Sequence, residues 1–160
     1  MAYSNYVKAL ELLSQCEHFE EMGGQPLVVI EEAETLMDIK FSRQIKEFLA
    51  DYGYISFCGH EVYGIIKDNF GDFHTLAGSM VQSNLSYRQD YGLPKEWVHI
   101  YDFGYDGYLG CLDHSQLNDE GEPPVIMVGY DGKQFFIAEK IEEDLGDFLL
   151  ELVENCLKAI

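Results

Sequence analysis

The chain has 160 residues, of which 47% are apolar and 14% aromatic, so it can bury a core and is too aromatic for a disordered protein. It carries 29 acidic residues against 10 basic ones, a formal net charge of −19, which argues against nucleic-acid binding and against docking on anionic membranes. A charge of this sign favours a basic partner, either a cationic protein surface or a bound cation.

Helices are predicted first along the chain, over residues 4–19, 30–37 and 41–53. Apolar residues recur at near-helical spacing in each range. We expect Ser4 to cap the first helix and Ser42 to cap the third, because a serine side chain can accept a bond from a free backbone N–H. Gly53 is expected to end the third helix in the left-handed conformation.

Short aromatic and β-branched runs follow, and they predict strands over residues 54–59, 61–66, 97–101, 108–113, 125–129 and 133–138. A helix over residues 79–92 interrupts them and ends at Gly92. The sequence Gly-Tyr-Asp-Gly occurs at 104–107 and again at 129–132, each time between predicted strands. Because Asp-Gly readily supplies positive φ, we expect a two-residue hairpin turn at both copies.

The last element is the clearest helix, over residues 144–160, with an apolar stripe and Asp144 as its cap. Together the elements predict one α+β domain spanning residues 1–160. We expect a mostly antiparallel sheet of short strands, flanked by N-terminal helices and a C-terminal helix.

The cysteines and the absence of targeting signals indicate a reduced, cytoplasmic setting. No stretch near the N-terminus pairs a basic region with an apolar one, as a signal peptide does, and no apolar run approaches a membrane span in length. Cys16, Cys58, Cys111 and Cys156 lie far apart and include no CxxC pair, so neither zinc spacing nor a disulfide framework is indicated. We therefore expect four reduced, mostly buried thiols.

The stretch DFGYDGYLGCLD, residues 102–113, partly matches an EF-hand calcium loop, with Asp102, Asp106 and Asp113 at positions 1, 5 and 12. Position 3 is Gly104, which offers no side-chain oxygen, and position 12 lacks the bidentate glutamate. The flanking segments are also strand-like rather than helical. We therefore favour a structural turn and predict no metal site and no cofactor.

Catalytic residues are not indicated either. Asp102 and Asp106 could act as an acid/base pair, but no nucleophile or oxyanion motif accompanies them. None of the five histidines stands in an HxxxH or HExxH arrangement. We expect a protein that is not an enzyme, and a hydrolase using these two aspartates stays as an alternative.

Tyrosines and aspartates interleave in the same stretch, which suggests a rigid aromatic and acidic patch. Tyrosine is enriched at binding hot spots, and carboxylates steer a basic partner. The alternative is that some of these rings line the core. The predicted interface comprises Asp68, Asp72, Tyr101, Asp102, Tyr105, Asp106 and Tyr108.

The order of motifs resembles the SUKH superfamily over about residues 28–157, with an extra helix of about residues 4–22 before it. The motifs that carry the resemblance are Phe48-Leu49, Tyr52-Gly53, Glu61-Val62-Tyr63-Gly64, Arg88 before Gly92-Leu93-Pro94, Leu112-Asp113, and the Leu-rich terminal helix. That superfamily contains a fungal cell-wall assembly regulator and many bacterial immunity proteins.

The resemblance implies an α+β domain that binds and neutralises a cognate toxin, commonly an attacker of nucleic acid, and it brings no catalytic residues. We expect an immunity protein whose acidic, tyrosine-containing surface blocks a basic toxin domain. The alternative is a regulatory scaffold for endogenous partners, for example in cell-envelope control. A homodimer also stays open, because residues 125–129 and 133–138 are apolar on both alternating faces.

Overall fold

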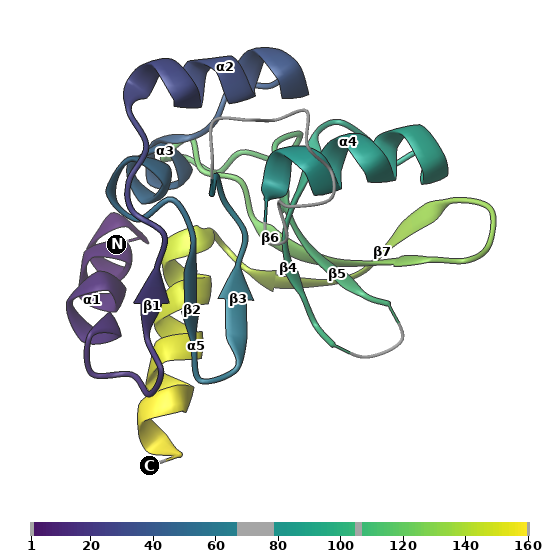
Figure 1. Ribbon diagram of the computed structural model, residues 1–160. Helices are drawn as coiled ribbons and strands as arrows, with labels where there is room; N and C mark the ends of the chain where they lie inside the picture. The colour runs from purple at the N-terminus through teal and green to yellow at the C-terminus, as the bar shows by residue number, and fades with distance from the viewer. Residues whose placement is uncertain (1, 67–78, 105–106, 160) are drawn as a thin grey trace.

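The computed structural model describes residues 2–66, 79–104 and 107–159. Within these ranges the chain is one α+β domain, as the sequence predicts, with five helices and two antiparallel sheets (Figure 1). The helices are α1 (Ala2–Leu13), α2 (Leu27–Met37), α3 (Arg43–Asp51), α4 (Met80–Tyr91) and α5 (Leu145–Lys158). Among these helices, none combines the length and the apolar composition that crossing a bilayer requires.

The strands form two sheets instead of one. The strands are β1 (Glu20–Glu21), β2 (Ile55–Phe57), β3 (His60–Val62), β4 (Trp97–Asp102), β5 (Leu109–Asp113), β6 (Val125–Tyr130) and β7 (Phe135–Glu142). The first sheet has the order β1-β2-β3 and the second the order β4-β5-β6-β7. The backbone N–H of Tyr63 donates to the carbonyl of Ile100 at 2.7 Å, and this backbone bond links the end of the first sheet to β4.

Most helix ends follow the sequence prediction. The side chain of Asp144 accepts a bond from the backbone N–H of Asp147 at 2.9 Å and caps α5. Gly92, with φ +70°, ends α4, and Ser42 occupies the N-cap position of α3, although its side chain makes no capping bond. The cap predicted at Ser4 is wrong, because α1 begins at Ala2 and places that serine inside the first turn.

A tight hairpin joins β2 and β3, which correspond to the strands that the sequence predicts over residues 54–59 and 61–66. Cys58 and Gly59, with φ of +49° and +83°, form a two-residue turn between β2 and β3, as a type I′ turn requires. At the second Gly-Tyr-Asp-Gly copy, Tyr130 pairs with Phe135, which leaves a four-residue loop. The two-residue turn predicted there is therefore wrong. The Asp131 side chain accepts two backbone N–H bonds within this loop, which favours the longer turn.

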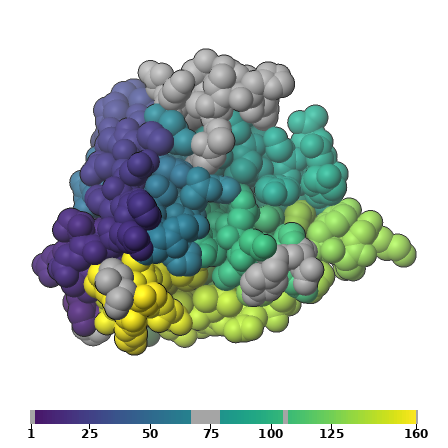
Figure 2. Space-filling model, turned by 60° about the horizontal axis from the view of Figure 1, so that its bottom comes forward, coloured from purple at the N-terminus to yellow at the C-terminus, as the bar shows by residue number. Residues whose placement is uncertain are grey.

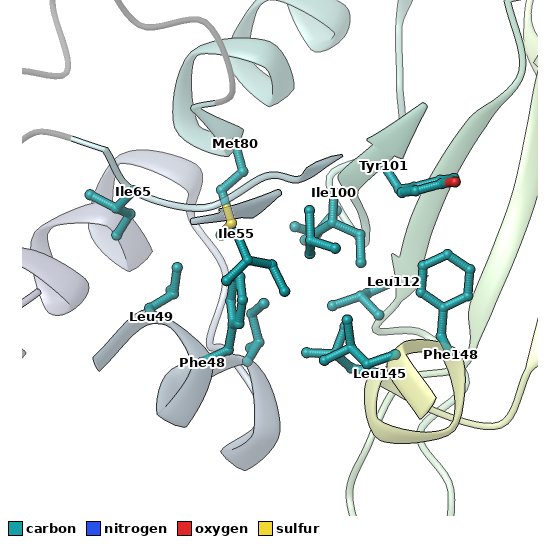
Figure 3. Close-up of a cluster of buried hydrophobic side chains, with 14 of the residues drawn as sticks. Phe48, Leu49, Ile55, Ile65, Met80, Ile100, Tyr101, Leu112, Leu145 and Phe148 are labelled. Atoms are coloured by element: carbon teal, nitrogen blue, oxygen red, sulfur yellow. The ribbon is translucent and has the colours of Figure 1, made fainter. Parts of the chain in front are cut away.

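Helices cover both faces of the four-stranded sheet. The larger core lies on one face of the four-stranded sheet, where that sheet meets the first sheet and the helices α1, α3 and α5. It includes Phe48, Ile55 and Leu112 (Figure 3). A smaller cluster on the other face contains Cys111 and packs beneath Tyr87 of α4. Neighbouring residues of β5 thus face opposite cores, as alternation along a strand requires.

Two of the four cysteines are not reduced thiols. Cys58 and Cys156 form a disulfide although they are 98 residues apart in the chain, with their Cα atoms 6.1 Å apart. Cys16 and Cys111 are buried free thiols. The sequence prediction failed here because the pairing depends on how the β2–β3 turn meets α5, and cysteine spacing carries no information about that contact.

Candidate protein-binding surface

The structure separates the residues of the predicted interface. Four of them, Asp68, Asp72, Tyr105 and Asp106, lie outside the described residues. Tyr101 is a core side chain, 7% exposed, whose ring packs edge-on against Phe148 and whose hydroxyl lies 2.7 Å from Nδ1 of His60 (Figure 3). Asp102 is exposed and Tyr108 is half-buried. The described surface of the predicted interface therefore consists of Asp102 and Tyr108.

Asp102 is held in a fixed orientation at the end of β4. Its Oδ2 accepts the hydroxyl of Tyr63 at 2.6 Å, and its Oδ1 lies 2.7 Å from Nε2 of His99. The Asp102 side chain is still 44% exposed, whereas that of His99 is 1% exposed. Partial burial raises the pKa of Asp102. The hydrogen bond and charge of His99, together with the hydrogen bond from Tyr63, lower it by more, so the pKa lies below its usual value. The result is a charged, oriented carboxylate that solvent can reach.

The same network bears on the enzyme alternative, because Ser83, His99 and Asp102 are the residue types of a nucleophilic triad. The Ser83 hydroxyl lies 2.8 Å from Nδ1 of His99 and 3.3 Å from the carbonyl of Met80. Ser83 stands on a regular turn of α4, and the His99 ring between α4 and β4 is buried. The contacts of His99 with Ser83 and Asp102 hold the Asp102 carboxylate in place, and we interpret the network as support for its orientation.

Aromatic rings continue from this network across the surface. The Tyr87 ring packs edge-on against His99 with centroids 5.3 Å apart, and its centroid lies 6.3 Å from that of Tyr91. Tyr91 packs against Tyr130 at 5.3 Å, and Tyr130 against Phe135 at 5.1 Å. Tyr91 is 50% exposed and Tyr130 is 39% exposed. We call Asp102, Tyr87, Tyr91, Tyr130 and Phe135 the acidic–aromatic surface.

Further carboxylates border this surface. Asp90 precedes Tyr91 and Asp131 follows Tyr130, and both aspartates are exposed. Backbone N–H groups of Gln134 and Lys133 donate to Asp131 and lower its pKa. The β6–β7 hairpin that carries Tyr130 and Asp131 projects from the body of the molecule (Figures 1 and 2). A partner can therefore contact exposed rings and fixed negative charges together.

The repeated Gly-Tyr-Asp-Gly sequence could have predicted part of this surface. Tyr130 occupies the same place in the second Gly-Tyr-Asp-Gly copy that Tyr105 occupies in the first. Only the first copy was assigned to the interface. Tyr91 gave a weaker signal, since it ends a helix beside Gly92 and its packing against the hairpin depends on the tertiary fold.

A second acidic region is a pocket of about 400 Å³ between α1, α5 and the end of β7. Its carboxylates come from Glu142, Asp147, Glu151 and Glu154. Burial, a hydrogen bond with Glu151 and the neighbouring negative charges raise the pKa of Glu142 to about 7. Glu142 thus still carries its proton as the pH approaches neutrality, and a lysine or arginine side chain entering the pocket would displace that proton.

Comparison with protein families assigns the chain to one family. Residues 20–154 match the family SUKH_5, described as "SMI1-KNR4 cell-wall". The match spans most of the chain, so the protein belongs to this family, and the SUKH resemblance seen in the motif order is confirmed. A comparison with curated protein sequences finds no match.

Proposed function

We propose that the protein is a non-enzymatic immunity protein, which binds a basic toxin domain and blocks its active site. Family membership is consistent with this role. The observation that carries the proposal is the continuous run of contacts from Asp102 to Tyr130. It links an oriented carboxylate to half-exposed rings through His99 and Tyr87. Carboxylates and tyrosines in this arrangement suit a cationic protein cleft.

Charge and aromatic contact have separate tasks in this proposal. The net charge of −19 accelerates encounter with a cationic partner and suppresses binding to acidic ones. Tyr91 and Tyr130 then bury apolar area with few rotatable bonds, which slows dissociation. A toxin that cleaves nucleic acid needs a cationic cleft for its substrate, so an acidic inhibitor would compete for the same site.

The second candidate is a regulatory scaffold for endogenous partners. The description of the matching family refers to the cell wall, which favours a role in envelope control. The two candidates differ in their partner, because an immunity protein has one toxic partner and a scaffold has several harmless ones.

Affinity capture from the source cells tests the binding partner. The tagged wild type, the double variant Tyr91→Ala/Tyr130→Ala and the control Leu27→Ala serve as baits at low and moderate salt. Leu27 is an exposed leucine on α2, outside the acidic–aromatic surface. We expect one stoichiometric basic chain on the wild type and the control, less of it at higher salt, and binding about tenfold weaker or worse to the double variant.

The other outcomes are equally clear. A basic partner that the double variant retains in full would overturn the assignment of the surface. A set of acidic or housekeeping chains would favour the regulatory scaffold.

A further inference from the structure

Three cysteines from distant parts of the chain meet near one end of the molecule. Cys16 lies in the turn after α1, Cys58 at the tip of the β2–β3 hairpin and Cys156 in the last part of α5. Their sulfur atoms all lie within 4.8 Å of one another. The end of α1, the hairpin turn and the lower part of α5 lie together at the bottom of Figure 1. Among the described residues, this is the one cluster of potential metal ligands.

The disulfide between Cys58 and Cys156 does not account for the third thiol. Cys16 is buried, and its Sγ donates a weak hydrogen bond of 3.9 Å to the carbonyl of Leu12. The backbone N–H of Cys58 donates to the carbonyl of Glu17 at 2.8 Å, which fixes the hairpin tip beside the turn that carries Cys16. A backbone bond thus holds Cys58 beside the turn of Cys16, and the disulfide holds Cys156 there.

Two residues in or next to the cysteine cluster have a positive φ angle. Cys58 has φ +49° at the first position of a type I′ turn, where asparagine, aspartate or glycine is preferred. A side chain with a Cβ, such as cysteine, is strained there. His18, two residues after Cys16, also has a positive φ of 57°. Strained positions of this kind concentrate at functional sites, and here they flank the thiols.

We propose that Cys16, Cys58 and Cys156 form a three-thiolate site for a thiophilic divalent cation, with Zn²⁺ as the expected ion, in the reduced protein. Zinc–sulfur bonds of about 2.3 Å place three thiolates about 4 Å apart. The two disulfide sulfurs must therefore separate on reduction, and the Cys16 sulfur already lies within reach of both. Three cysteine ligands leave the fourth tetrahedral position for water. The site is separate from the acidic–aromatic surface and does not depend on the proposed function.

Binding requires reduction of the disulfide and loss of the thiol protons. A dithiol reductant supplies two electrons and two protons, which convert Cys58 and Cys156 to thiols while the reductant closes its own disulfide. One Zn²⁺ then displaces a proton from each of the three thiols. A bound cation stabilises each thiolate directly.

The test uses Cd²⁺ as a probe, because sulfur ligation gives a thiolate-to-metal charge-transfer band that carboxylate binding to an acidic protein does not give. We expect the reduced wild type to bind one Cd²⁺ per chain, with Zn²⁺ competing, and the disulfide form to give no band. Cys16→Ser should weaken binding by more than about tenfold, since even loss of an outer-shell partner costs that much. Cys111→Ala, which removes the buried thiol of β5, is the matched control and should bind normally.

A second measurement needs no variant that could misfold. The reduced wild type is alkylated with and without Zn²⁺, and the modified peptides are identified by mass. We expect Zn²⁺ to protect Cys16, Cys58 and Cys156 and to leave the labelling of Cys111 unchanged. The absence of a charge-transfer band, a full-strength band in Cys16→Ser, or equal labelling with and without Zn²⁺ would overturn the proposal.

Discussion

The side chain of Asn84 connects α4 to β4 by bonding both the N–H and the carbonyl of His99. Its Oδ1 accepts the N–H of His99 at 2.7 Å, and its Nδ2 donates to the carbonyl of His99 at 3.0 Å and to that of Met80 at 2.6 Å. The side chain is fully buried. This amide therefore sets the position of α4 relative to the strand that carries Asp102.

Replacing this amide should destabilise the fold. Asn84→Ala leaves the backbone groups of His99 buried without a partner, so we expect the free energy of unfolding to fall by about 2–3 kcal/mol in urea titration. Asn5→Ala is the control, because Asn5 makes one bond to Asp147 at a partly buried position. Its loss should be below about 1 kcal/mol. Equal losses for the two variants would contradict the role of Asn84.

Glu142 should make stability depend on pH. Its pKa is about 7 in the folded protein against an ordinary 4.5, so the folded state binds more protons between these values. The free energy of unfolding should therefore fall as pH rises from 4.5 to 7, by an amount that stays constant above that window.

The variant Glu142→Gln removes this titration. We expect it to be more stable than wild type by about 1 kcal/mol at about pH 8, after allowance for solvent screening, and equal to wild type near pH 4. Urea titrations at both pH values measure the difference. A difference that does not change with pH would show that the carboxyl has no raised pKa.

At the scale of elements, the end of β3 passes very close to the turn after α3. The N–H of Ile65 donates to the carbonyl of Gly53 at 2.8 Å, and a Cβ added at Gly64 would collide with that same carbonyl oxygen. Gly53 has φ +72°, in agreement with the left-handed stop that the sequence predicts for this helix. Only glycine fits at position 64 without moving the backbone.

Gly64→Ala should therefore lower the free energy of unfolding by about 2 kcal/mol or more, because the clash is with backbone atoms that cannot rotate away. Gly121→Ala is the control, since φ at Gly121 is also positive, at +78°, but its Cβ would meet open space. We expect a loss of about 1 kcal/mol there, from backbone strain alone. Thermal or urea unfolding measures both, and a smaller loss for Gly64→Ala than for the control would contradict the close approach.

Elements with strong local patterns could be predicted, and those defined by tertiary contact could not. The apolar stripe and the Asp144 cap specified α5, and Gly92 specified the end of α4. The two exposed residues of β1, Glu20 and Glu21, form a strand only because β2 lies beside them. The division into two sheets likewise depends on how β3 and β4 meet without pairing as strands, which no local pattern encodes.

At the scale of the whole molecule, the sequence predicted the fold class correctly but located only part of the acidic–aromatic surface. Asp102 was correctly placed at an exposed strand end, whereas Tyr101 next to it faces the core because a register shift in β4 turns its ring inward toward Phe148. Tyr91 and Tyr130 are 39 positions apart in the chain and meet only when α4 packs beside the β6–β7 hairpin. Their contact could not be predicted from their separation in the sequence.

The most direct test of the immunity proposal is survival of a host that expresses the captured basic partner. We predict that the partner alone kills the host, that co-expression of the wild-type protein restores growth, and that the Tyr91→Ala/Tyr130→Ala variant does not. A partner that is harmless when expressed alone, or one whose toxicity persists while the wild-type protein is bound to it, would contradict the proposal.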